Sequence, residues 1–228
     1  MKRRTLDIMF SIGAFGLAGL LAVIGFVMAS NADFAKNYVG EQLSRQKITF
    51  TTLDKLSPED KAYTEARTGC VITYAGQALT TGKQAECYAN EYIGSHLSRM
   101  PAGTDGMTYS EIGAAQTDLR AKIATAKESG DPAVADLEKQ VADLTAARET
   151  VFKGEMLRGA LLTSFGFSDL GVKAEQGARV AYIAAILLAL LSIAGFVHAF
   201  ITPKTKAFAP VEVEQSESVG NGRSVVKV

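Results

Sequence analysis

The sequence predicts a mainly α-helical membrane protein in which two transmembrane helices flank a helical extracytoplasmic domain with an αα-hairpin and one disulfide. Three observations support this fold class. Two long apolar runs without a charged residue occupy residues 8–29 and 180–201. Apolar residues recur at helical spacing over residues 109–152. The two cysteines, Cys70 and Cys87, both lie between the apolar runs.

The first apolar run reads IMFSIGAFGLAGLLAVIGFVMA. At about 1.5 Å per residue it spans roughly 33 Å, which is enough to cross a hydrocarbon core of about 30 Å as a helix. Lys2, Arg3 and Arg4 precede the run, so the positive-inside rule places residues 1–7 in the cytoplasm. Residues 30–32 resemble a signal-peptide cleavage site, but the apolar segment of a secretory signal is shorter, about 7–15 residues. The length favours an uncleaved anchor.

The second apolar run reads VAYIAAILLALLSIAGFVHAFI. Lys204 and Lys206 follow it and indicate a cytoplasmic end, which agrees with the orientation of the first run. We therefore expect a protein of the plasma membrane, in contact with lipid, with both termini in the cytoplasm and residues 30–179 outside. Residues 202–228 mix Pro, Ser, Gly and charge without periodicity, which predicts a disordered cytoplasmic tail.

Each apolar run carries a stripe of small residues along one helix face. Small residues let helix backbones approach closely in lipid, where no hydrophobic effect drives association. The stripes either pair the two spans or dock another membrane protein, unless they only reflect how common alanine and glycine are in membrane helices. The stripes comprise Ser11, Ala14, Ala18, Ala22, Gly25 and Ala29, and then Ala181, Ala185, Ser192, Gly195 and Ala199, interrupted by Leu188. The predicted helix-packing residues are Ala14, Ala18, Ala22, Gly25, Ala185, Ser192 and Gly195.

Several helix starts are visible in the extracytoplasmic domain. Residues 31–46 are amphipathic and predict a helix that opens the domain. Ser57, ahead of a proline and two acids, is a typical helix start. Thr81 with Gln84 forms a capping box for a helix over residues 82–99.

The clearest pattern in this domain is a pair of apolar seams joined by a turn at residues 130–132. Three- and four-residue steps are typical of helices that pack side by side. Because the two seams are of similar length, the turn favours an αα-hairpin over about residues 109–152 rather than a long parallel dimer. Arg148 occupies one seam position. The seams comprise Tyr109, Ile112, Gln116, Leu119, Ile123 and Ala126, and then Val134, Leu137, Val141, Leu144 and Val151.

Residues 152–178 return the chain to the second apolar run and are rich in apolar side chains. Gly154, Gly159, Gly166 and Gly171 predict that this segment is not one continuous helix, because glycine disfavours a helix interior. The segment either lies on the bilayer surface or packs under the extracytoplasmic domain.

Cys70 and Cys87 are expected to form a structural disulfide, which an extracytoplasmic location permits. Closing a loop of this length stabilises a fold by about 3 kcal/mol in the chain-entropy account. A redox pair is disfavoured because the Cys-x-x-Cys motif is missing. A zinc site would need more ligands than the two cysteines and the nearby His96.

The remaining sequence signals argue against catalysis and against binding of nucleic acid, a cofactor or a metal. The 24 basic and 24 acidic residues balance, which disfavours nucleic-acid binding. Glu86 and Glu91 have a spacing that does not place both carboxylates on one helix face. His96 and His198 are interpreted as packing or interfacial residues. We find no catalytic or phosphate-binding motif, and we expect no enzyme activity, cofactor or metal.

Four segments of the chain together resemble a family of uncharacterised two-pass membrane proteins of actinobacteria. They read MKRRTLDIMFSIG, SNADFAKNYVGEQLSRQKITF, YAGQALTTGKQAECYANEYIGSHL and AGFVHAF, and the resemblance spans most of residues 1–201. Proteins of this layout include accessory subunits of the actinobacterial respiratory supercomplex. We therefore expect a non-catalytic accessory, scaffolding or assembly subunit of a larger envelope complex, such as a respiratory cytochrome complex, with other membrane proteins as partners. The alternative is a receptor module that binds an envelope ligand or lipid.

Overall fold

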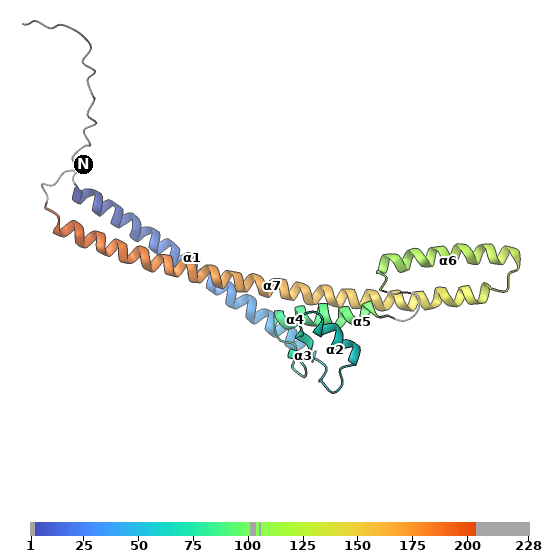
Figure 1. The fold of residues 1–228 in the computed structure, drawn as a ribbon. Helices are drawn as coiled ribbons and strands as arrows, with labels where there is room; N and C mark the ends of the chain where they lie inside the picture. Colours follow the sequence, from blue (N-terminus) through green and yellow to red (C-terminus); the bar gives the residue numbers. More distant parts are fainter. Residues whose placement is uncertain (1–2, 101–103, 105, 204–228) are drawn as a thin grey trace, which may run out of the picture. The chain divides into compact units, whose positions relative to one another are not determined.

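The computed structural model describes residues 3–100, 104 and 106–203, and its described part is mainly helical and contains no β-strand. Only the first two residues of the predicted tail fall within these ranges, and the rest of the tail lies outside them. The helices are labelled in Figure 1. They are α1 (Arg3–Arg45), α2 (Pro58–Glu65), α3 (Cys70–Thr73), α4 (Gly82–Cys87), the π-helix η1 (Tyr88–Ile93), α5 (Gly94–Ser98), α6 (Tyr109–Ser129) and α7 (Val134–Ile201).

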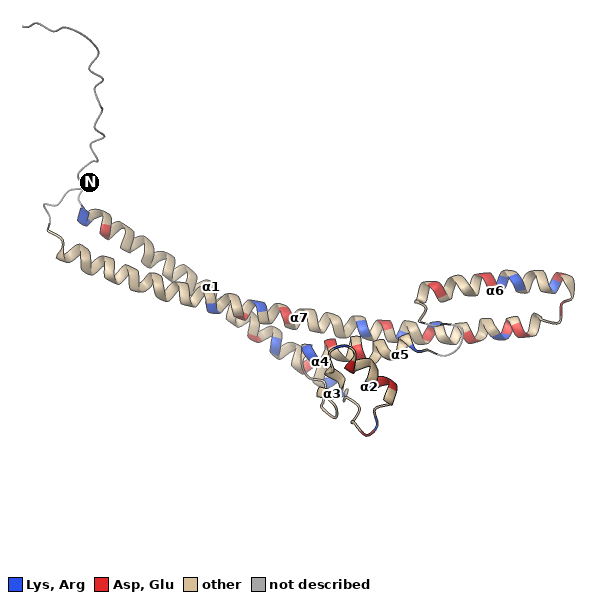
Figure 2. Ribbon diagram, in the orientation of Figure 1, with Lys and Arg blue, Asp and Glu red and all other residues tan. Residues whose placement is uncertain are grey.

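Two of these helices, α1 and α7, are long and apolar enough to cross a membrane. Only 11% and 17% of their most apolar windows are buried, so neither is the enclosed core helix of a water-soluble domain. Figure 2 shows these stretches nearly free of charged residues. The two apolar helices indicate a membrane protein.

The described residues form two compact units. The first contains residues 3–23 of α1 and residues 181–201 of α7. Most of its buried positions recur every seven residues, at Ser11 and Ala18 and again at Ala185, Ser192 and Ala199, which is the spacing of a coiled-coil seam, and Ala181 is buried as well. Large apolar side chains occupy the outward faces of both helices and are exposed, including Phe10, Leu20, Leu187 and Leu191.

The second unit, residues 24–180, has a core built from several short elements and α7. Phe50, Val71 and Leu79 are almost fully buried, and Leu161 of α7 belongs to the same cluster. Part of residues 152–178 therefore packs against this core, which is one of the two expected locations.

The prediction that glycines interrupt residues 152–178 was wrong, because α7 is one continuous helix through all of them. A helix glycine costs about 1 kcal/mol relative to alanine, and tertiary contacts can outweigh that cost. A Cβ at Gly154 would lie 2.7 Å from a methyl carbon of Leu97, and one at Gly171 would lie 2.9 Å from Ala35. These two glycines permit close packing.

The predicted helix starts are confirmed, and two of the predicted helices differ in extent or form. Ser57 caps α2, and Thr81 with Gln84 forms the capping box of α4. The amphipathic residues 31–46 are not a separate helix but continue the first apolar run within α1, which ends at Arg45. The helix predicted over residues 82–99 is present as α4, η1 and α5, with an unpredicted π-helical middle.

Helix α6 contacts the first turns of α7 through a mixed apolar and polar seam. Ile112, Leu144 and Val151 form its buried apolar cluster. The buried Gln116 donates a hydrogen bond to Thr145 Oγ1 at 2.8 Å and accepts one from the Arg148 guanidinium at 3.2 Å. Polar residues therefore occupy the centre of this seam.

Candidate functional site

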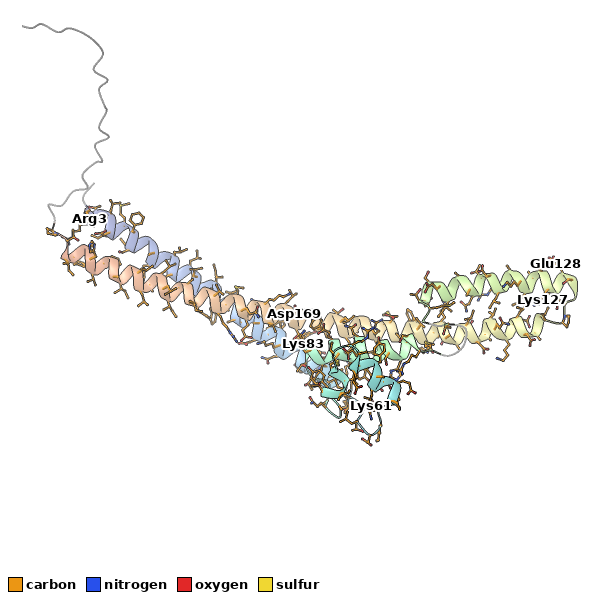
Figure 3. All side chains as sticks on the ribbon, viewed as in Figure 1. Arg3, Lys61, Lys83, Lys127, Glu128 and Asp169 are labelled. Carbon is orange, nitrogen blue, oxygen red and sulfur yellow. A yellow bond between two sulfur atoms is a disulfide. The ribbon has the colours of Figure 1, made fainter. Side chains whose placement is uncertain are left out.

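A cavity of about 620 Å³ opens in the second unit between the helices around the disulfide and α7. Cys70 and Cys87 lie on its wall, together with Glu91 of η1 and Arg158 of α7. Lys83 of α4, labelled in Figure 3, also lines it. The cavity combines a disulfide with carboxylates and cations, which makes it the best-formed candidate site among the described residues.

The Cys70–Cys87 disulfide is formed, as predicted, with the two Cα atoms 6.0 Å apart. It joins the first residue of α3 to the last residue of α4. Cys87 is buried, whereas Cys70 is half-buried and is the more exposed of the two residues. The bond closes the segment that carries one wall of the cavity.

Glu91 is a buried carboxylate beside this disulfide, and only 5% of the residue is exposed. It accepts hydrogen bonds from the hydroxyls of Thr64 and Thr68 and from the Thr68 backbone N–H. These hydroxyls in turn accept from the backbone N–H groups of Val71 and Cys70, at 3.4 and 3.3 Å. Glu91 thus ties the start of α3 to η1, in parallel with the covalent link.

The structure separates the two acids that the sequence placed near each other. Glu86 lies towards the surface and pairs with Lys83 at 3.0 Å, whereas Glu91 faces the interior. Sequence reasoning tested these acids only as a catalytic pair and did not recognise Glu91. The sequence did offer one signal, because Glu91 follows Cys87 by four residues. The π-helical turn that contains Glu91 was not predictable.

The cations around the cavity are already engaged. Arg158 donates from Nε to the Ala89 carbonyl at 3.1 Å and pairs with Glu155 at 2.8 Å. Arg67 stacks on the Tyr63 ring, 4.5 Å from its centroid. A π-helical turn shifts backbone groups out of the regular α-helical hydrogen-bond pattern. Ala89, whose carbonyl accepts from Arg158, lies within such a turn.

His96 lies beside Asp60 rather than with the cysteines. Its Nδ1 is 2.7 Å from the Tyr92 carbonyl, and its Nε2 is 3.9 Å from an Asp60 oxygen. Burial raises the pKa of Asp60, but hydrogen bonds from Ser57, Arg99 and Ser95 outweigh it and hold that pKa below its usual range. His96 is thus part of a polar cluster that holds α2 against α5.

The predicted packing residues of the first unit are partly brought together. The Ser192 hydroxyl donates to the Ser11 carbonyl at 2.8 Å, and a Cβ at Gly195 would overlap the Ser11 hydroxyl. Ala18 and Ala185 are also buried, whereas Ala14, Ala22 and Gly195 are half-buried. Gly25 is buried and belongs to the second unit.

His198 has a partner that sequence reasoning missed. Its Nδ1 lies 3.0 Å from an oxygen of Asp7, which directly precedes the first apolar run. The Arg4 guanidinium lies 5.6 Å from the centroid of the Phe200 ring in the same unit. Both contacts join the start of α1 to the end of α7.

Three exposed aromatic rings gather on the second unit, and we call them the aromatic patch: Phe34 and Tyr38 of α1 and Phe167 of α7. Their exposed fractions are 59%, 48% and 40%. The ring centroids are 5.7 to 6.5 Å apart. The ion pair between Lys36 and Glu175 joins the same two helices. The sequence predicted an amphipathic helix over residues 31–46 but gave no link between its aromatic residues and Phe167.

Comparison of the chain with known protein families, with curated proteins and with solved structures found no match.

Proposed function

We propose that this chain is a non-catalytic two-pass membrane protein that serves as an accessory, scaffolding or assembly subunit of a larger envelope complex. In this proposal both termini lie in the cytoplasm, and residues 30–179 form an extracytoplasmic domain in which α6 and the start of α7 fold as an αα-hairpin. The sequence resemblance to actinobacterial two-pass proteins makes a respiratory cytochrome complex the first partner to test.

The observation that carries this proposal is the aromatic patch. Clustered exposed aromatic side chains are costly to leave in water and are typical of interaction sites. Phe34 follows the first apolar run by about 7.5 Å of helix, so the patch would face the headgroup layer or the membrane-proximal surface of a neighbouring subunit.

The contacts of the first unit support a docking role for the patch. The small residues Ser11, Ser192 and Gly195 meet one another, so these three positions are already occupied within the chain and are not free to dock a partner. A partner subunit would therefore meet the large outward side chains of the spans and, outside the bilayer, the aromatic patch.

Affinity purification of the full chain from its native membrane in mild detergent tests this proposal. We expect stoichiometric partner subunits with the unmodified chain and their loss with the double variant Phe34→Ala, Phe167→Ala. Leu53→Ala is the matched control, because Leu53 is an exposed apolar residue of the same unit outside the patch. Purification as a bare monomer in several mild detergents would contradict the proposal.

The orientation has its own test. Single cysteines at Thr5, Ser129 and Ser216 are labelled from outside intact cells with a membrane-impermeant thiol reagent. We expect labelling at Ser129 alone. External labelling at Ser216 would contradict the two-span topology.

The cavity favours a second candidate function, an envelope receptor module. Its volume of about 620 Å³ lies within the usual range of small-molecule sites. A ligand screen by thermal shift of the full chain in detergent distinguishes this alternative. It predicts a stabilising compound whose effect disappears in Arg158→Ala.

A further inference from the structure

We propose that reduction of the Cys70–Cys87 disulfide creates a binding site for a soft divalent cation such as Zn²⁺, with Cys70, Cys87 and Glu91 as ligands. This inference does not depend on the proposed function. It rests on the placement of three ligand atoms, on the support around Glu91, and on the charge that reduction would produce.

The geometry is the first argument. One ligand atom from each of Cys70, Cys87 and Glu91 lies within 4.8 Å of the other two. Zinc binds thiolate sulfur at about 2.3 Å and carboxylate oxygen at about 2.0–2.2 Å, so ligand atoms around one ion lie about 3.5–4 Å apart. Small side-chain rotations after cleavage of the S–S bond would suffice. The cavity beside these residues leaves room for water at a fourth position.

The environment of Glu91 is the second argument. Two threonine hydroxyls and one backbone N–H hold its carboxylate in place, and such outer contacts orient the ligands of metal sites. All of these donors are neutral, and Glu91 forms no ion pair with any described residue. The cations that line the cavity contact other groups, Arg158 with Glu155 and Lys83 with Glu86, so none of them pairs directly with this buried acid.

Charge is the third argument. The disulfide is neutral, but reduction adds two thiols beside the Glu91 carboxylate. Ionising them would place up to three negative charges together in a buried site, which is unfavourable unless a cation neutralises them. A divalent cation removes this repulsion, and its binding displaces the two thiol protons to solvent.

A dithiol can supply the two electrons by thiol–disulfide exchange. One thiolate of the dithiol attacks the sulfur of Cys70, the more exposed residue, and Cys87 leaves and takes up a proton. The second thiolate of the dithiol attacks the mixed disulfide, forms the oxidised reductant and releases Cys70, which also takes up a proton. Two electrons and two protons pass from the dithiol to the chain.

The test uses the full chain in detergent, reduced with a phosphine and desalted under nitrogen. Competition with a chromophoric chelator measures Zn²⁺ binding. We expect one Zn²⁺ per reduced chain, no specific binding by the oxidised chain, and at least tenfold weaker binding by reduced Glu91→Gln. Glu86→Gln is the matched control, because Glu86 lies on the same cavity but towards the surface. Equal affinities of wild type and Glu91→Gln, or no binding by the reduced chain, would overturn the proposal.

Two further readouts protect the test against a misfolded variant. X-ray absorption of the zinc-loaded wild type should show two sulfur neighbours at about 2.3 Å together with oxygen neighbours. Four sulfur neighbours would mean that zinc bridges two chains and would reject the three-ligand site. Zn²⁺ should also slow air reoxidation of the wild type at least tenfold, and an unchanged rate would count against the site.

Discussion

The two helix pairs of this chain are held together by different kinds of residue. In the first unit, Ser11, Ser192 and Gly195 bring the backbones of α1 and α7 into close contact. In the second unit, the contact between α6 and α7 combines the buried Ile112 with the polar pair Gln116 and Arg148.

The difference reflects the solvent expected around each pair. Burial of large apolar side chains lowers the free energy in water but not in lipid. Helices in lipid therefore associate through close backbone packing and interhelical hydrogen bonds. Buried polar residues in a water-exposed seam instead restrict the register, because any other register leaves them without partners. The following substitutions test this difference between the two pairs.

Ile112→Ala should have the largest effect. Ile112 is fully buried between α6 and α7, and removing such a side chain costs about 2–4 kcal/mol. Hydrogen exchange should show faster exchange of the α6 amides and little change in the first unit. Ile123→Ala, at a half-buried position of the same helix, should have a clearly smaller effect. Equal effects would mean that Ile112 does not anchor the seam.

Gly195→Val should separate the helices of the first unit. A Cβ there overlaps the Ser11 hydroxyl, and overpacking of this kind costs about 1–3 kcal/mol. Thermal unfolding in detergent, followed by circular dichroism, measures the loss. Gly16→Val is the matched control because a Cβ at Gly16 would meet no atom within 4 Å. Equal losses in both variants would show that close packing at Gly195 is not what holds the pair.

Gln116→Ala should weaken the polar part of the α6–α7 seam. It removes the hydrogen bond that the Thr145 hydroxyl accepts and the one that the Arg148 guanidinium donates, which costs about 1–3 kcal/mol. Hydrogen exchange of α6 again provides the measurement, and Gln140→Ala on the exposed face of α7 is the control. Faster exchange confined to α6 supports a register-setting role, whereas unchanged exchange argues against it.

Ser192→Ala tests the hydrogen bond of the first unit alone. Its hydroxyl donates to the Ser11 carbonyl, and such bonds between membrane helices contribute about 0.6 kcal/mol on average. Thr163→Ala, which removes a hydroxyl bonded only within α7, is the control. Because one such hydrogen bond contributes little, Ser192→Ala should lower the stability measured by unfolding in detergent less than Gly195→Val does. A larger loss would mean that hydrogen bonding, rather than packing, dominates this pair.

The smallest effect concerns acid pH and the second unit. The pKa of Asp60 is lower in the folded state than in the unfolded chain, because its hydrogen bonds outweigh burial. Its stabilising contribution is therefore complete above an unfolded pKa of about 3.9 and is lost as the pH falls through the folded value. Asp60→Asn should make the free energy of unfolding depend less on pH in the acid range. Asp54→Asn, at an exposed position, should leave this pH dependence unchanged. An identical profile for Asp60→Asn and wild type would contradict this account.

Local signals in the sequence predicted several features correctly. Helix starts at Ser57 and Thr81 were predictable because capping involves residues only a few positions apart. The two apolar helices and the disulfide were predictable from run length and from the presence of a single cysteine pair. The contact of Phe34 and Tyr38 with Phe167 was not predictable, because it joins residues far apart in the chain.

Helix starts and membrane-length apolar stretches can be predicted from the sequence, because these properties depend on neighbouring residues, and a single pair of cysteines leaves one possible disulfide within the chain. Packing, in contrast, makes Gly154 and Gly171 contact points rather than helix breaks, because the atoms they approach belong to Leu97 and Ala35 of other helices. It likewise decided that Glu91, and not His96, lies beside the disulfide. The π-helical turn and the threonines that hold Glu91 come together only when α2, α3 and η1 pack.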